Sequence, residues 1–136
     1  DSRVVLCKAG GEFQRLTEDH RASTNKAEVE RVKKAGGFVF RNRVSGTLAV
    51  TRALGHEVDR ELISNTPHIS KTALSPSDVA IVVATDGVWD TVPEAEAARI
   101  VEGARMGGKS PTEAAEALKD YALGKYCRDN ICAVVI

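Results

Sequence analysis

Apolar residues cluster in several short runs along the chain, and such runs, when turn residues bound them, are typical of β-strands. They predict strands over residues 3–7, 12–16, 38–40, 47–50, 67–73, 79–84 and 130–136. Turn residues at 8–11 and 75–78 predict two hairpins, one between the first pair of strands and one between strands 67–73 and 79–84. Strand 79–84 is apolar at every position, so we expect both of its faces to be covered.

Three segments carry apolar residues at helical spacing, and each has a recognisable beginning. Asn25, Thr91 and Ser110 are each followed three residues later by a glutamate, which is the spacing of a capping box. Proline in the first turn supports the last two helices, and a pair of glycines at 36–37 ends the first. The apolar stripes are Val29, Val32 and Ala35, then Ala97, Ile100, Val101 and Ala104, then Ala114, Leu118, Tyr121 and Ala122.

The predicted elements follow the order strands, helix, strands, two helices and a final strand. Hairpins dominate this order and a strict alternation of strand and helix is absent. It therefore favours an α+β fold in which antiparallel sheets have helices packed outside. The polar segment 54–66 has neither periodicity, so we expect a surface loop there.

Charge and composition exclude several classes of function. The 136 residues contain 19 basic and 19 acidic side chains, and this balance gives no reason to expect a nucleic acid or an anionic membrane as partner. No apolar run approaches the roughly 18 residues of a membrane span, and the first residues do not resemble a signal peptide. We therefore expect an intracellular protein with a cytoplasmic or nuclear location.

Three cysteines, an odd number without C-x-x-C spacing, argue against a disulfide framework or a thiolate zinc site. We expect each of them, Cys7, Cys127 and Cys132, to be a small buried apolar residue. Strand-like residues lie directly at both ends of the chain. Because domains usually carry a few polar residues beyond their terminal strands, we expect the chain to be part of a larger domain.

Three aspartates stand beside predicted strands and are the first candidates for chemistry. Asp1 precedes strand 3–7, Asp86 follows strand 79–84, and Asp129 precedes strand 130–136. Carboxylates at strand ends can converge at one edge of a sheet, where Mg²⁺ or Mn²⁺ would find the oxygen ligands that it prefers. The alternative is that these residues only form turns. After Asp86, we expect Trp89 to belong to the core and Asp90 to stabilise the start of the next helix.

Basic residues are the other candidates, and for them a structural role is the expectation. Arg41, Arg43 and Arg52 lie in one stretch, where they could bind phosphate or could be solvated or paired with carboxylates. We expect the solvated or paired state. The histidines show no metal-ligand spacing, so we expect surface or supporting roles for His20, His56 and His68.

Taken in order, short motifs along the whole chain resemble the C-terminal part of protein phosphatase 2C (PPM) domains, the metal-dependent serine/threonine phosphatases. The motifs are Asp1-Ser2-Arg3, Leu16-Thr17-Glu18-Asp19-His20, Ala35-Gly36-Gly37, the stretch from Arg43 to Gly55 (RVSGTLAVTRALG), Pro67-His68-Ile69, Thr85-Asp86-Gly87-Val88-Trp89-Asp90 and Arg128-Asp129-Asn130. Each is weak alone, but the ordered series is specific.

This resemblance implies an αββα architecture, an antiparallel β-sandwich flanked by helices, of which residues 1–136 are one portion. It also implies two Mn²⁺ or Mg²⁺ ions, with a third at a weaker site. Asp86 and Asp129 match two aspartates that bind one of the paired ions, and Asp1 matches an aspartate of the third site. The implied activity is hydrolysis of phosphoserine and phosphothreonine in phosphoprotein substrates by metal-activated water.

Two departures from the family pattern limit this expectation. The family's N-terminal portion, which carries the other metal ligands, a D-G-H-G-G segment and a phosphate-binding arginine, is absent, so we expect the isolated chain to be inactive. His56 also stands where the family usually has aspartate after R-A-L-G. The alternative function is therefore a non-catalytic, phosphatase-like module for binding or regulation. We further expect the chain to self-associate or to pair with the missing N-terminal portion.

Overall fold

The computed structural model describes all residues from Asp1 to Ile136 and divides them into two compact units. The larger, here called the sheet unit, contains residues 2–18 and 70–136. The smaller, here called the α1 unit, contains Asp1 and residues 19–69. No helix is long and apolar enough to cross a membrane.

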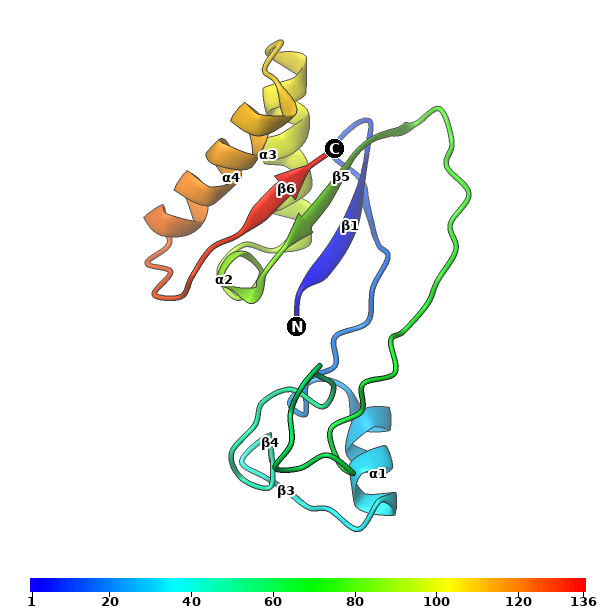
Figure 1. Cartoon of the computed structure of the whole chain (residues 1–136). Coiled ribbons are helices and arrows are strands. Elements are labelled where there is room, and N and C mark those ends of the chain that lie inside the picture. Colours follow the sequence, from blue (N-terminus) through cyan, green and yellow to red (C-terminus); the bar gives the residue numbers. More distant parts are fainter. The chain divides into compact units, whose positions relative to one another are not determined.

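A four-stranded antiparallel sheet forms the centre of the sheet unit, with strand order β2-β1-β5-β6 (Figure 1). Its strands are β1 (Arg3–Lys8), β2 (Phe13–Arg15), β5 (Asp78–Ala84) and β6 (Ala133–Val135). The register places Val5, Val82 and Val135 side by side across three strands. Since side chains alternate along a strand, Val4, Val83 and Val134 share the opposite face.

Two long helices cover one face of this sheet. They are α3 (Glu94–Met106) and α4 (Pro111–Gly124), and a single short turn, α2 (Asp86–Trp89), follows β5. The main core lies between helices and sheet and includes Val5, Val82, Val88, Val101 and Leu118. Trp89 belongs to this core, as predicted, and its indole Nε1 donates a hydrogen bond of 2.8 Å to the carbonyl of Ala84. The α+β prediction is thus confirmed.

The α1 unit has its own small core. It contains α1 (Lys26–Lys34) and a two-stranded sheet of β3 (Val39–Phe40) and β4 (Arg43–Val44). Arg41 and Asn42 connect these strands with φ angles of 49° and 61°, which is the backbone of a type I′ hairpin turn. The core consists of Ala22, Val32, Val44 and Ile63. The segment 54–66 contains no helix or strand, as expected, although its Ile63 is buried.

Helix beginnings follow the predictions at two of three places. The Asn25 side chain accepts from the amide of Glu28, and Ser110 with Glu113 forms a complete capping box. The box predicted at Thr91 is wrong, because α3 begins after Pro93 without a side-chain cap. The Thr91 hydroxyl donates instead to the carbonyls of Gly87 and Val88.

Glu94, the glutamate of that predicted box, joins α3 to the first hairpin. Its carboxylate accepts from Arg3 of β1 at 2.9 Å and from Arg15 of β2. Burial alone would raise the pKa of Glu94, but hydrogen bonds from its own backbone and from Arg15 hold this pKa below its usual range. The local pattern predicted that Glu94 would cap the helix, but in the structure its carboxylate forms ion pairs with arginines of β1 and β2.

Two strand predictions are wrong. Residues 67–73 form no strand, because β5 takes β1 and β6 as its two neighbours. Residues 47–50 make only isolated bridges. The expectation for 79–84 is also corrected: within β5 only Val82 and Ala84 are buried, because α3 and α4 pack on a single face.

The three thiols are free and differ in their surroundings. Cys7 is fully buried in the main core, where burial, together with the charge of Glu102, raises its pKa to about 11. Cys127 is half-buried and Cys132 is exposed. The expectation of a buried apolar residue therefore holds for Cys7 and is wrong for Cys132.

Candidate functional site

Asp86 and Asp129, far apart in the sequence, line the same pocket of the sheet unit, which has a volume of about 560 Å³. Asp86 is the first residue of α2, directly after β5, and Asp129 lies in the segment that leads from α4 to β6. One carboxylate oxygen of Asp129 accepts from the amide of Asn130 at 2.7 Å. The rest of the lining is Gly87, Asp90, Thr91, Tyr126, Cys127 and Arg128.

A close approach of two backbone segments brings the aspartates to this pocket. Gly87 lies against Asn130, and a Cβ atom at position 87 would collide with the Asn130 carbonyl. Glycine is therefore required where the segments meet, because it alone lets the backbones come so near. The glycine of the D-G motif after β5 therefore does more than form a turn. Its lack of a side chain lets the segment that carries Asp129 pack against it.

The donor chemistry of this pocket suits a hard divalent cation, which prefers carboxylate oxygens. No group of three or more histidine, cysteine, aspartate or glutamate side chains is placed to hold a metal ion. Two carboxylates make an incomplete site, because Mg²⁺ and Mn²⁺ take about six ligands. Metal binding by Asp86 and Asp129 stays a prediction, with their carboxylates expected within about 8 Å of each other.

Asp1, the third predicted metal ligand, belongs to the α1 unit. Its carboxylate accepts from Arg21 Nε at 3.2 Å. Its role at a third metal site stays a prediction.

The three arginines considered for phosphate binding contact other groups of the protein instead. Arg52 binds both carboxylate oxygens of Glu28, at 2.7 and 3.1 Å, and donates to the Thr66 carbonyl. Arg43 donates to the Thr47 carbonyl, and Arg41 lies over the Phe40 ring. The expectation of paired or solvated arginines agrees with these contacts.

Glu28 is the centre of a cluster that the sequence analysis missed. It is only 4% exposed, and besides Arg52 it accepts from Arg31 and from the Thr51 hydroxyl at 2.8 Å. Burial alone would raise the pKa of Glu28, but the hydrogen bonds from Arg52, Arg31 and Thr51 outweigh it and lower this pKa to about 2. Capping-box spacing hid this role, since Glu28 also lies in the first turn of α1, three residues after the N-cap Asn25.

Two histidines of the α1 unit lie close together. The rings of His20 and His68 have centroids 6.3 Å apart. The Nε2 atom of His20 is buried without a hydrogen bond. Burial, together with the charge of Arg52, lowers the pKa of His20, which favours the neutral imidazole.

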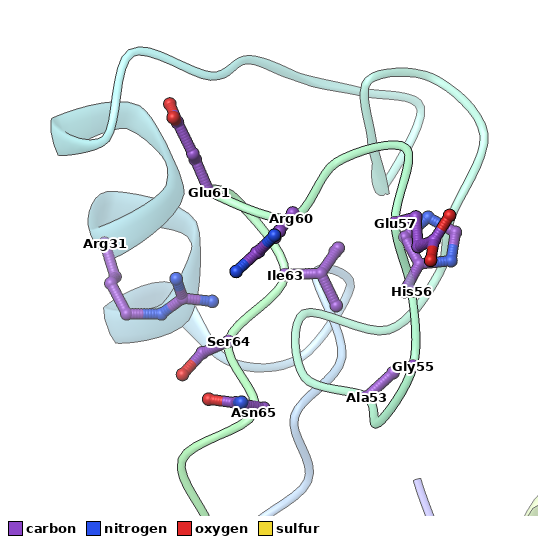
Figure 2. A pocket seen from close by; sticks show the side chains of 10 residues that line it. All are labelled: Arg31, Ala53, Gly55, His56, Glu57, Arg60, Glu61, Ile63, Ser64 and Asn65. Carbon is purple, nitrogen blue, oxygen red and sulfur yellow. The ribbon is translucent and has the colours of Figure 1, made fainter.

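His56 lines a separate pocket of about 600 Å³ within the α1 unit (Figure 2). Arg31 reaches this pocket from α1, whereas His56, Arg60 and Asn65 come from segment 53–65. The pocket is larger than the one with Asp86 and Asp129, but its lining mixes both signs of charge and contains no predicted metal ligand. We therefore regard the pocket of Asp86 and Asp129 as the candidate site.

Comparison with known proteins decides the family. The model of the family "Protein phosphatase 2C" matches residues 1–131. The chain belongs to the protein phosphatase 2C family. It is 36% identical over 136 residues to "Protein phosphatase 2C homolog 1" of Saccharomyces cerevisiae, covering all of this chain and 46% of that relative.

Solved structures agree with this family assignment. A C. elegans sex determining protein matches with a TM-score of 0.86 at 31% identity, over 99% of this chain and 34% of its own. A Toxoplasma gondii phosphatase matches with a TM-score of 0.82 at 26% identity, over 99% of this chain and 44% of its own. The predicted resemblance and the protein phosphatase 2C type of fold are thereby confirmed. The chain spans less than half the length of these relatives.

Proposed function

We propose that the protein containing this chain removes phosphate from phosphoserine and phosphothreonine side chains of other proteins. Family membership supports this reaction class. The observation that carries the proposal in this chain is the single pocket lined by both Asp86 and Asp129, the two aspartates of the motifs D-G-V-W-D and R-D-N.

In this proposal Asp86 and Asp129 act as ligands of a Mn²⁺ or Mg²⁺ ion, one of two that the complete domain would hold. When bound, such ions would lower the pKa of water so that hydroxide is available to attack phosphorus, and they would neutralise charge on the transferring phosphoryl group. The two aspartates would bind and orient the cation. Neither of them is required as a nucleophile or as a proton acceptor.

The isolated chain is expected to lack this activity. Asp86 and Asp129 would supply only part of the ligands of one cation, and a two-metal reaction needs both cations at a fixed spacing. We propose that residues 1–136 form the C-terminal portion of one catalytic domain, and that the remaining ligands come from another portion of it.

One observation favours a non-catalytic role as a second candidate. His56 stands at the position where the family pattern has a carboxylate, and its imidazole lies in a pocket with Arg31 and Arg60. An imidazole can carry positive charge where a carboxylate carries negative charge, so this part of the domain would interact differently with substrate. In that case the domain binds phosphoproteins without hydrolysing them.

Phosphopeptide hydrolysis by the whole protein in millimolar Mn²⁺ distinguishes these candidates. We expect turnover that chelation with EDTA abolishes, and a kcat/KM at least about 100-fold lower in Asp86→Asn and in Asp129→Asn. Asp120→Asn, an exposed aspartate on α4, serves as the matched control and should retain activity. Absence of Mn²⁺-dependent turnover in the wild-type protein, with phosphopeptide binding retained, would favour the non-catalytic module.

A further inference from the structure

The two segments that carry the candidate ligands lie close together and both line the pocket. One segment is 85–87, with Asp86 at its centre, and the other is 127–132, with Asp129. The backbone joins them once, where the Thr85 amide donates to the Cys132 carbonyl at 3.0 Å. Two carboxylates repel each other when no cation lies between them, so other groups must hold these segments together.

The Thr85 hydroxyl reaches from the first segment to the backbone of the second. It donates to the Asn130 carbonyl at 3.4 Å and accepts from the Cys132 amide at 3.1 Å. Thr85 occupies the N-cap position of α2, where a threonine hydroxyl ordinarily accepts from an amide of its own helix, but it makes no such cap. Its hydroxyl bonds the backbone of the second segment instead.

The Cys127 thiol reaches in the opposite direction. Its sulfur donates to the Gly87 carbonyl at 3.0 Å, and it lies 3.6 Å from the carbonyl of Asp129. Cys127 also lines the pocket together with Asp86 and Asp129. The two side chains thus form reciprocal ties, each from the segment of one aspartate to the backbone of the other.

We infer that Thr85 and Cys127 are positioning residues for the metal site, an inference that rests on the proposed function. Neither side chain is proposed as a ligand of the cation. They hold the segments of Asp86 and Asp129 at a fixed separation, so that both carboxylates can meet one ion. Metal ligands must lie within a few tenths of an ångström of their ideal distances, so a small shift of either segment weakens binding.

Titration calorimetry of the whole protein with MnCl₂ tests the Thr85 tie. Thr85→Val removes the hydroxyl at nearly constant shape, and we expect the Kd for Mn²⁺ to rise about tenfold, as for other groups that orient metal ligands. Thr85→Ser keeps the hydroxyl and should stay within about twofold of wild type. If Thr85 only stabilised the fold, Thr85→Val would lower stability, and Thr85→Ser would not restore the affinity for Mn²⁺.

The Cys127 tie is tested in the same way. Because a thiol is a weak donor, Cys127→Ala should raise the Kd only about threefold, whereas Cys127→Ser, with a stronger hydroxyl donor, should not raise it. Cys132→Ala is the matched control, since its exposed thiol makes no tie. Hydrogen exchange without metal gives an independent readout: the Cys132 amide should exchange faster in Thr85→Val than in Thr85→Ser.

The outcomes separate this inference from the proposed function. If wild-type protein binds Mn²⁺ and only Asp86→Asn and Asp129→Asn lose binding, the metal site stands and the positioning role of Thr85 and Cys127 is overturned. If wild-type protein does not bind Mn²⁺, the proposed function itself fails. If the Cys132 amide exchanged at the same rate in Thr85→Val as in wild type, the proposed role of the Thr85 hydroxyl in holding this segment would be wrong.

Discussion

At the scale of single residues, the buried carboxylate of Glu28 connects several segments of the α1 unit. Arg52, Arg31 and Thr51 all donate to it, and through them it joins α1 to the segment around R-A-L-G. Removing one partner of a buried charge leaves the others without compensation, which costs more than an average hydrogen bond.

We expect Glu28→Gln to destabilise the protein by about 2 kcal/mol, less than for a fully buried ion pair, because both arginines retain some solvent contact. Hydrogen exchange of the α1 amides measures the effect where it occurs. Glu30→Gln on the same helix is the matched control, because Glu30 is exposed and pairs only with Lys33. Equal exchange in the two variants would contradict the role given to Glu28.

The same residue predicts a dependence on pH. The pKa of Glu28 falls from an ordinary 4.5 to about 2 in the folded protein, so its stabilising contribution is fully present above pH 4.5 and is lost as the pH falls toward 2. Over that window, wild-type protein should lose stability more steeply than Glu28→Gln. Urea unfolding followed by circular dichroism at several pH values checks this, and parallel curves would refute it.

At the scale of elements, α4 depends on its capping box. The Ser110 hydroxyl accepts from the Glu113 amide, and the Glu113 carboxylate accepts from the Ser110 amide at 2.8 Å. Ser110→Ala should cost about 1 kcal/mol of stability. Unfolding followed by Trp89 fluorescence reports this loss, because Trp89 and Leu118 of α4 share one core. Thr112→Ala, exposed in the same helical turn, should change stability by less than about 0.5 kcal/mol.

Two glycines should respond differently to substitution by alanine, because one lies where two segments meet and the other lies inside a helix. Alanine at position 87 would place its methyl group against the Asn130 carbonyl, so Gly87→Ala should cost about 3 kcal/mol and disturb the candidate site. Gly103, inside α3, has no atom near the position of an added methyl group. Gly103→Ala should therefore stabilise the protein by about 0.5–1 kcal/mol. Urea denaturation of both variants compares them directly.

At the scale of the whole molecule, α3 and α4 leave one face of the main sheet uncovered. Its apolar residues are Val4, Leu6, Ile81, Val83, Val134 and Ile136. Exposure grows toward β6, reaching 48% for Val134 and 71% for Ile136. An apolar sheet face of this kind, next to an edge strand, favours association with another chain or segment.

We therefore propose that the isolated chain self-associates through this face or binds a separately supplied N-terminal portion. Analytical ultracentrifugation at micromolar concentration should show a dimer or a larger species. Val134→Lys should shift it toward monomer, whereas Leu123→Lys on α4, at a position with 53% exposure, should not. A well-folded wild-type monomer at these concentrations would contradict the proposal.

The sequence by itself determined the elements whose signals are local. Apolar spacing predicted the strands β1 and β5. Side chains that bond nearby backbone groups predicted the start of α1 at Asn25 and the capping box of Ser110. The ordered motifs also determined the family, because they lie along the whole chain in one order. The roles of Asp86 and Asp129 were predicted from that resemblance rather than from spacing.

Only the tertiary structure decided where side chains with several possible partners bind. Glu28 and Glu94 had the spacing of caps, yet both carboxylates bind arginines from distant segments. The turn at Arg41-Asn42 has no glycine, so Asn42 was the only local sign of its positive φ angles. Likewise, the collision that makes Gly87 necessary involves Asn130, far along the chain. Such contacts depend on which segments meet in space, and local periodicity holds no information about that.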